Sequence, residues 1–547
     1  MALSLTISLF LSLFLGPLLA SKFIHVKDFE KDSKKDKEGK LELYYKRFLG
    51  FLIHRKYLVI PVILFLVAMG YFIYSSIGSG FMPEMDEGAF ILDYTSPPGT
   101  SLTETNRILM HVEKIIMSIP EVESYSRRTG TQLGFFITEP NNGDYLVKLK
   151  NNRSRGINTI IDELRNKVEN SEPALQIEFG QAMQDLIGDL TSVPSPVEIK
   201  VFGDDKSLIQ KKAKEIADLI SNVNGVVDVF DGIVISGPAY IIHFNLPAIS
   251  RAGFTVDELS NIINNDIQGN VTTEIQRGEK LIGVRVRLPD RYRNDIDLLK
   301  NIRVASSNGN SYLLGSLADF SIDPGQSEID RENLKLMVAV TSRISGRDLG
   351  STISNIKSVL NKNLNLPSGV TLEYGGTFKT QQESFQGLLK VLLMASLLVL
   401  LVLVIEFERF LVPLAIYFVA VLSLFGVVLA LWVTNVNFNI SSFMGAIMMV
   451  GIVAENSIFL AHYFFIFQNR GMDRHEAVIN ASMVRSRPII MTALAAIFAL
   501  MPLALGIGAG SQMQQPLALA VIGGFTLSSL LLLFILPVLL SISKKHR

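Results

Sequence analysis

A single carboxylate interrupts a long apolar run in the last quarter of this 547-residue sequence. Glu455 stands in the stretch MMVGIVAENSIFLA, where it is the only charged residue. A charged side chain at the centre of a bilayer costs about 2.5–3.5 kcal/mol, so an ionisable group in such a place usually has a function. Burial disfavours the ionised form, and a carboxyl group that binds and releases a proton there could transfer protons between the two sides of a membrane.

Two polar residues near this carboxyl group could take part in such a transfer. Asn456 adjoins Glu455 in the sequence, and Thr492 lies on the next apolar segment. Both side chains can donate hydrogen bonds to a carboxylate. Two interpretations stay open: a proton relay through Glu455, Asn456 and Thr492, or polar contacts between helices, worth about 0.6 kcal/mol per hydrogen bond.

The segments that must position these residues have the composition of membrane helices. The mean hydropathy of the chain is +0.34, and only 19% of its residues are charged. A bilayer core of roughly 30 Å needs about 20 mostly apolar residues in one helix. Seven segments meet or approach this requirement: 3–20, 57–77, 388–405, 411–433, 440–465, 488–507 and 516–542.

The first apolar segment has two interpretations, a retained membrane helix over 1–20 or a cleaved signal peptide that ends near Ala20. It lacks the basic n-region of a signal peptide. The stretch 21–56 that follows holds eleven Lys and Arg residues. A short basic loop tends to stay in the cytoplasm, so we expect a retained helix and a cytoplasmic basic linker over 21–56.

The orientation of the remaining chain follows from this linker. The segment 57–77 would cross outward, and 78–387 would then form a large domain outside the membrane. A five-helix domain over 388–542 and a cytoplasmic tail at 543–547 complete the chain. The two short loops that this scheme places outside carry no Lys or Arg, in agreement with the positive-inside rule. We therefore expect the large domain to lie outside the cytoplasm, which in a two-membrane bacterium means the periplasm, with the helices in the bacterial inner membrane.

The large polar region alternates strand and helix patterns. Helices are predicted over 102–118, 155–169, 206–222 and near 348–362. Ser101 and Glu104 form the pattern of a capping box at the start of the first helix. The strands between these helices suggest repeated split βαβ units. The expected fold class is a membrane α-helical bundle plus an α+β domain of ferredoxin-like subdomains.

Several function classes have no support in the sequence. Lys plus Arg and Asp plus Glu both number 51, which gives no basic surface for nucleic acid. The chain has no cysteine and no P-loop, dinucleotide-binding, nucleophile-elbow or HExxH pattern. We therefore expect a protein that is not an enzyme, with no cofactor and no nucleic-acid partner.

Six stretches of the chain have the pattern of a known family: FMPEMDEGAF (81–90), PPGTSLTE (97–104), PEVESYSRRTG (120–130), GAIMMVGIVAENSIFLAHY (445–463), RSRPIIMTALAAIFALMPLALGIGAGSQ (485–512) and IGGFTLSSLLLLFILPVLL (522–540). They resemble the resistance–nodulation–division efflux transporters and are closest to the heavy-metal-efflux branch. The resemblance runs in order along nearly the whole chain. It implies that Glu455 and Thr492 occupy proton-relay positions, although Ile489 stands where copper and silver exporters have a lysine.

The resemblance covers only the second half of a full-length family member. It implies that the missing half lies on another chain or is absent. It also implies a homotrimer in the lipid bilayer, bound to a periplasmic adaptor and an outer-membrane channel. Two functions stay open: a proton-driven exporter of toxic metal cations or organic solutes, and a non-transporting remnant or assembly partner of a split transporter.

Other residues that could bind metal or substrate give weaker signals. Glu84, Asp86 and Glu87 follow the second apolar segment, where they could line a cation-attracting vestibule or form a solvated acidic collar. The methionines are read as core or interface residues and the isolated histidines as structural, so no metal site is expected. The side chains concerned are Met82, Met85, Met110, Met337, His111 and His243.

Overall fold

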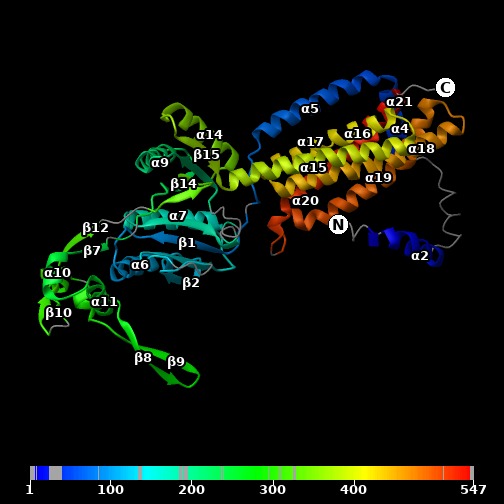
Figure 1. The fold of residues 1–547 in the computed structure, drawn as a ribbon. Helices are drawn as coiled ribbons and strands as arrows, with labels where there is room; N and C mark the ends of the chain where they lie inside the picture. The colour runs from blue at the N-terminus through cyan, green and yellow to red at the C-terminus, as the bar shows by residue number, and fades with distance from the viewer. Residues whose placement is uncertain are drawn as a thin grey trace. The chain divides into compact units, whose positions relative to one another are not determined.

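The computed structural model describes residues 6–7, 9–23, 40–83, 85–133, 138–183, 186, 188, 195–235, 237, 239–293, 295–306, 309–323, 328–508 and 510–542. The chain divides into two compact units. One unit combines Met1–Met85 with Gln381–Arg547, and the other is Asp86–Thr380. We call them the helical unit and the α/β unit and describe each by itself (Figure 1).

The helical unit contains, among the described residues, six helices long and apolar enough to cross a membrane. They overlap the last six segments predicted from the sequence. They are α5 (Val59–Ser76, preceded by η2, Lys56–Leu58), α15 (Gly376–Phe407), the pair α16 (Leu411–Leu422) and α17 (Leu424–Val433), α18 (Ile440–Asn469), α19 (Arg474–Ala504), and the series α20 (Gln515–Leu530), η5 (Leu531–Ile535) and α21 (Leu536–Ile542).

The first predicted span, 3–20, lies partly outside the described residues. Its described part is helical, with η1 at Leu11–Leu15 and α2 at Gly16–Phe23. The basic stretch 21–56 was predicted as a linker, but its C-terminal part forms the helix α4 (Lys40–His54). The span at 3–20 stays a prediction.

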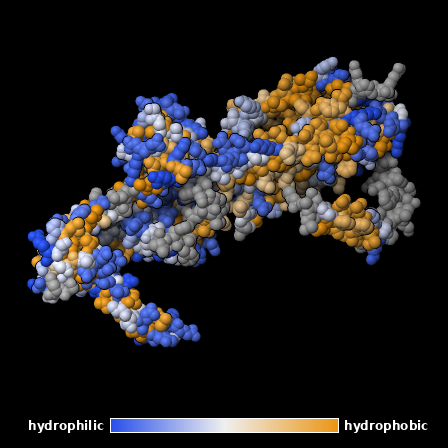
Figure 2. All heavy atoms as spheres, in the orientation of Figure 1, coloured by the Kyte–Doolittle hydropathy of each residue, from blue (hydrophilic) through white to orange (hydrophobic). Residues whose placement is uncertain are grey.

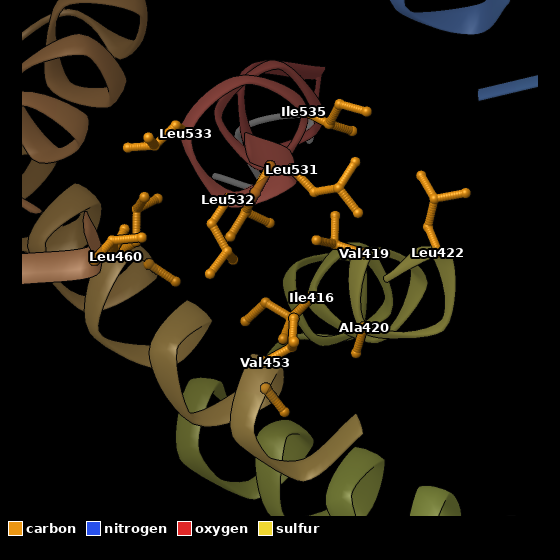
Figure 3. Packing of buried hydrophobic residues seen from close by; sticks show 14 of the residues in the cluster. Ile416, Val419, Ala420, Leu422, Val453, Leu460, Leu531, Leu532, Leu533 and Ile535 are labelled. Atoms are coloured by element: carbon orange, nitrogen blue, oxygen red, sulfur yellow. The ribbon is translucent and has the colours of Figure 1, made fainter. Parts of the chain in front are cut away.

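The centre of the helical unit is a packed apolar core. Ile416 and Val419 of α16 lie with Val453 and Leu460 of α18 and with Leu532 of η5 in one buried cluster (Figure 3). The outer surface of the same unit is also rich in apolar side chains (Figure 2). Lipid is as apolar as the core, so this exposed apolar surface suits a bilayer.

Glycines bring these helices into close contact. A Cβ atom added at Gly426 of α17 would lie 2.4 Å from the carbonyl oxygen of Gly523 in α20. One added at Gly524 would lie 2.6 Å from Met449 of α18. Membrane helices use small residues at interfaces because backbone contact replaces the hydrophobic effect there. Gly523 and Gly524 therefore have a packing role.

The first half of the α/β unit is a β-α-β-β-α-β arrangement. Its four-stranded sheet has the order β2-β3-β1-β4. Helices α6 and α7 share a buried core with one face of this sheet. The elements are β1 (Ala89–Thr95), α6 (Leu102–Met117), β2 (Val122–Thr129), β3 (Asn142–Leu149), α7 (Ile157–Ser171) and β4 (Gln176–Gln181).

The second half repeats this order with an insertion. Its sheet has the path β13-β14-β5-β15, and β6 pairs with β14. Helices α9 and α14 pack on it in a second core. The elements are β5 (Val197–Phe202), α9 (Lys206–Ile220), β6 (Val226–Phe230), β13 (Asp330–Glu332), β14 (Lys335–Ile344), α14 (Leu349–Asn363) and β15 (Thr371–Gly375).

The insertion lies between β6 and β13 and has its own small core. Three two-stranded sheets, β7-β12, β8-β9 and β10-β11, accompany its short helices. The elements are β7 (Ala239–Phe244), α10 (Leu246–Ala252), α11 (Val256–Ile267), β8 (Asn270–Arg277), β9 (Lys280–Val286), α12 (Asp290–Arg293), α13 (Ile296–Lys300), β10 (Arg303–Ala305), β11 (Ser311–Leu313) and β12 (Ala318–Asp323).

The predicted capping box at the start of α6 is half correct. The Ser101 hydroxyl oxygen accepts a hydrogen bond from the Glu104 backbone N–H at 3.3 Å. The Glu104 carboxylate does not reach back to Ser101, because it pairs with Arg107 one turn later, with a closest distance of 2.7 Å. An ion pair on the helix surface thus replaces the second half of the box.

Candidate proton-relay site

Glu455 lies near the middle of the 30-residue helix α18 and is exposed on the surface of the helical unit. The neighbouring residues Val453 and Ser457 are buried against the bundle. Within the part of the chain that the structure describes, the Glu455 side chain has no hydrogen-bond or ion-pair partner. The carboxyl group therefore points away from the core of its own unit.

Glu455 belongs to an exposed stripe along α18. Met444, Gly451, Phe459 and His462 are also exposed, at spacings that place them on the same face of the helix as Glu455. A Cβ atom added at Gly451 would meet nothing within 4 Å. We call these five residues the α18 stripe. It combines apolar side chains, a gap at Gly451 and a carboxyl group one turn later.

The other two residues of the predicted relay do not contact Glu455 in this chain. Thr492 is exposed on α19, and its hydroxyl donates to the Pro488 carbonyl oxygen at 3.0 Å and to that of Ile489 at 3.1 Å. Asn456 is half-buried beside Glu455. No hydrogen bond joins these side chains among the described residues, so this half of the bundle does not by itself complete a hydrogen-bonded relay.

The predicted acidic vestibule is partly described. Glu84 lies outside the described residues. Asp86 forms an ion pair with Arg153 and accepts a hydrogen bond from the Ile157 backbone N–H at 3.2 Å, at the first turn of α7. Glu87 accepts from the Met183 backbone N–H at 2.6 Å. Both described carboxylates thus hold the α/β unit together locally.

His111 and His243 have ordinary polar partners. Nδ1 of His111 lies 2.9 Å from the Glu172 carboxylate, and Nε2 of His243 lies 3.0 Å from the Ser321 hydroxyl. Across the described part of the chain, no group of three or more His, Cys, Asp or Glu side chains is arranged to hold a metal ion.

The α/β unit contains a polar cavity that the sequence does not predict. It has a volume of about 260 Å³ and lies where the sheet of the first half meets β6 and β14 of the second. Its lining includes Asp93, Tyr94, Glu178, Asp228 and Arg343. Asp93 and Tyr94 lie on β1, which pairs directly with β4, the strand of Glu178, and β6 and β14 of the second half supply Asp228 and Arg343.

Ion pairs cross this junction beside the cavity. Arg165 of α7 donates through Nε and Nη2 to Asp228 of β6, at 2.7 and 3.1 Å. The Phe179 backbone N–H also donates to Asp228, at 3.1 Å. The Asp228 side chain is 0% exposed and that of Arg165 is 9% exposed. A second pair, Arg343 to Glu178 at 2.6 Å, joins β14 to β4.

Burial and charge act in opposite directions on Arg165. Burial of the guanidinium group lowers its pKa, and the carboxylates of Asp228 and Asp162 outweigh this effect, so the pKa of Arg165 is raised above its ordinary value. The Arg165 guanidinium group therefore stays charged beside Asp228, whose backbone is left-handed with a φ of 51°.

The sequence matches the AcrB/AcrD/AcrF family over residues 1–544. The chain belongs to this family. The expected resemblance to resistance–nodulation–division permeases is confirmed, and it includes heavy-metal transporters. The cobalt-zinc-cadmium resistance protein CzcA of Cupriavidus metallidurans is 27% identical over 524 residues, which are 92% of this chain and 49% of CzcA.

Two further relatives widen the comparison. The nickel and cobalt resistance protein CnrA of the same organism is 30% identical over 497 residues, 88% of this chain and 46% of CnrA. The multidrug resistance protein MdtC of Escherichia coli is 26% identical, over 91% of this chain and 48% of MdtC. This family member therefore spans about half the length of its curated relatives.

A solved structure supports the same fold. The crystal structure of a heavy metal efflux pump superposes with a TM-score of 0.81 at 27% identity, over 91% of this chain and 52% of that one. This chain therefore has the fold of an efflux permease, and it matches about half of the length of that permease.

Proposed function

We propose that this chain is one half of a proton-driven efflux permease in a bacterial inner membrane, completed by a second polypeptide. The observation that carries the proposal is the exposure of Glu455 on an apolar face of α18. A carboxyl group facing lipid at mid-membrane depth is costly, by about 2.5–3.5 kcal/mol for an ionised acid. A second polypeptide that covers the α18 stripe would remove this cost.

In this proposal Glu455 exchanges the proton, and its partners come from both halves. Asn456 and Thr492 would supply hydrogen bonds from this chain, and the second polypeptide would supply a further ionisable or donor group. Protonation of Glu455 would favour one packing of the two halves and deprotonation another. A difference of this kind in binding energy is what lets a proton gradient drive a conformational change.

The substrate class follows from the named relatives. We propose toxic metal cations or organic solutes, in keeping with the cobalt, zinc, cadmium, nickel and multidrug resistance named for CzcA, CnrA and MdtC. The carboxylates that line the cavity at Asp144, Glu178 and Asp228 are each paired with an arginine, so the cavity itself does not select between these two substrate classes. Each half of the α/β unit would act as a ferredoxin-like porter subdomain in the periplasm.

The proposed assembly has further parts. Seven membrane helices, including 3–20, would anchor the chain, and the vestibule would include Glu84 with Asp86 and Glu87. The complete permease would form a homotrimer with a periplasmic adaptor and an outer-membrane channel. The outer partners rest on the resemblance to the family, and the vestibule rests on the position of its carboxylates directly after the second apolar segment.

The test replaces Glu455 by Gln in the native background and measures resistance to metal salts and export of the metal. Glu455→Gln keeps the shape and the hydrogen-bonding capacity but binds no transferable proton. We expect loss of export to the level of a deletion strain, with normal amounts of protein in the membrane. The matched control is Glu406→Gln, an exposed carboxylate near the end of α15, which should keep full export.

The second candidate function is a non-transporting remnant or assembly partner. The incomplete hydrogen bonding around Glu455 among the described residues favours it. Unchanged export in the Glu455→Gln strain would contradict the proton-relay proposal. If the wild-type chain itself adds nothing to export in a deletion background, the remnant interpretation is the better one.

A further inference from the structure

Two histidines from distant parts of the chain lie next to each other in the helical unit. His54 is the last residue of α4, and His475 lies in the first turn of α19, which begins at Arg474. The two helices pack against each other. The centres of the two imidazole rings lie 5.9 Å apart, with an angle of 47° between the ring planes. Both side chains are exposed, so a solute can reach them.

Buried neighbours hold this histidine pair in place. On α4, Leu49 and Ile53 belong to the core of the helical unit, with exposed fractions of 0% and 2%. On α19, Ala477 and Val478 belong to the same core and are fully buried. Each histidine is thus within one helical turn of a residue that is fixed in the core. The packing of the two helices therefore sets the distance between the two rings.

A hydrogen bond determines which nitrogen of His54 can bind a ligand. Nδ1 of His54 lies 2.8 Å from the Gly50 carbonyl oxygen. A carbonyl oxygen only accepts hydrogen bonds, so Nδ1 carries the hydrogen and the neutral ring has its lone pair on Nε2. Metal-binding histidines usually donate from their other ring nitrogen to a carbonyl or carboxylate oxygen in this way. The His475 ring has no hydrogen-bond partner in the part of the chain that the structure describes.

Two arginines adjoin the pair in the sequence, and each is turned to another partner. The Arg55 guanidinium lies over the Phe51 ring, 5.3 Å from its centre. Arg474 donates to the Leu540 carbonyl oxygen at 2.9 Å. Asp473, the N-cap residue of α19, brings a carboxylate to the same turn. A cation at the histidine pair would therefore meet charges of both signs, and its binding is not excluded by repulsion.

We propose that His54 and His475 together bind one divalent transition-metal ion of the Zn²⁺ or Ni²⁺ class. Imidazole nitrogen is a preferred ligand of these ions. Zn–N bonds of about 2.1 Å at a tetrahedral angle put the centres of two bound rings roughly 5–6 Å apart. The observed separation of 5.9 Å lies in this range. Water completes the coordination, so the ion exchanges with the solution.

The bound ion would clamp α4 to α19, the helix that carries Thr492. Proton-driven export does not require such a clamp, so the site adds a role to the proposed function. In the orientation expected from the basic stretch 21–56, the pair would face the cytoplasm and respond to metal on that side. Only this location rests on the proposed function, and metal binding itself does not.

Metal binding by the full-length chain, purified in detergent without a polyhistidine tag, tests the pair directly. Zn²⁺ bound at equilibrium is quantified for the wild type, His54→Gln, His475→Gln and the double variant. We expect each single variant to bind the same one ion at least about tenfold more weakly, and the double variant to lose no further ion. The matched control His243→Gln removes an exposed histidine of the α/β unit and should bind as the wild type does. Mg²⁺, which prefers oxygen ligands, should not compete.

The absence of cysteine from the sequence allows a second test of the geometry. A chain with His54→Cys and His475→Cys together holds only two thiols, and soft ions such as Cd²⁺ bind thiolates that lie close together. We expect micromolar Cd²⁺ to slow maleimide labelling at least about tenfold in this variant. The variants with only one of the two cysteines should be labelled at the same rate with and without Cd²⁺.

The outcomes distinguish one shared site from two unrelated side chains. Wild-type Zn²⁺ binding in either single glutamine variant would overturn the proposal. The loss of a second ion in the double variant would also overturn it, because the two histidines would then bind separately. Equal labelling of the double-cysteine variant with and without Cd²⁺ would contradict the proposed proximity. Neither readout measures export, so failure of the export proposal and failure of this one can be told apart.

Discussion

Gly451 and Glu455 lie one turn apart on the same exposed face of α18. Each places a different requirement on the surface that covers this face. The glycine leaves room for the close approach of another helix, and a Cβ atom there would touch nothing in this chain. The carboxyl group needs a polar partner if the covering surface is dry. Gly426, by contrast, is already in backbone contact with Gly523 inside the unit.

This difference gives a prediction at the scale of single residues. Gly426→Leu should lower the free energy of unfolding of the isolated chain by at least about 1–3 kcal/mol, because the new side chain has no space between α17 and α20. Gly451→Leu should leave the thermal unfolding of the isolated chain in detergent unchanged. It should nevertheless reduce metal export several-fold by keeping a partner helix away. Wild-type export in Gly451→Leu would argue against a protein partner on the α18 stripe.

The sequence was informative about residues that break a local pattern. Glu455 stood out because nothing around it is charged, and Ser101 because it precedes a helix pattern. Asp228 could not be recognised in this way, since an aspartate at the edge of a predicted strand is usually solvated. Its partner Arg165 lies 63 residues away, and no local rule connects the two.

At the scale of elements, the junction between the two halves of the α/β unit depends on buried charge. Asp228 accepts hydrogen bonds from Arg165 and from the backbone of β4, and it is sealed from water. Removing one member of a buried ion pair leaves the other charge without compensation, which costs more than the pair itself contributes.

We therefore expect Asp228→Asn to destabilise the junction by about 3–5 kcal/mol. Hydrogen-exchange mass spectrometry of the full chain should show faster exchange in β4, β6 and α7. The control Glu104→Gln removes a carboxylate from an exposed pair with Arg107 and should leave the exchange of β4, β6 and α7 unchanged, because water screens such a pair. Equal protection of β6 in the two variants would mean that the buried pair does not hold the halves together.

The elements themselves were largely predictable, and their partners were not. Helices α6, α7, α9 and α14 begin and end within a few residues of the predicted limits, because caps and apolar periodicity are local signals. The pairing of β6 with β14 across the insertion is non-local. The helix α4 was missed because its charge density suggested a linker, although Tyr45, Leu49 and Leu52 already had helical spacing.

At the scale of the whole molecule, the helical unit has a well-packed apolar core, and much of its outer surface is apolar and exposed. The six candidate spans share a continuous core. Yet α5 and α15 bury only 11% of the residues in their apolar windows within this chain. Lipid or protein must cover the rest. In the proposed assembly, a second polypeptide covers part of this surface.

The account depends most on this second polypeptide. The most direct test tags the chain at its native locus, purifies it from membranes in mild detergent and identifies co-purified proteins by mass spectrometry with quantification. We predict one integral membrane protein of similar length at about equal stoichiometry, and its loss or weakening in Gly451→Leu. If the chain is recovered without such a partner and still transports metal against a proton gradient in proteoliposomes, the two-polypeptide account is wrong.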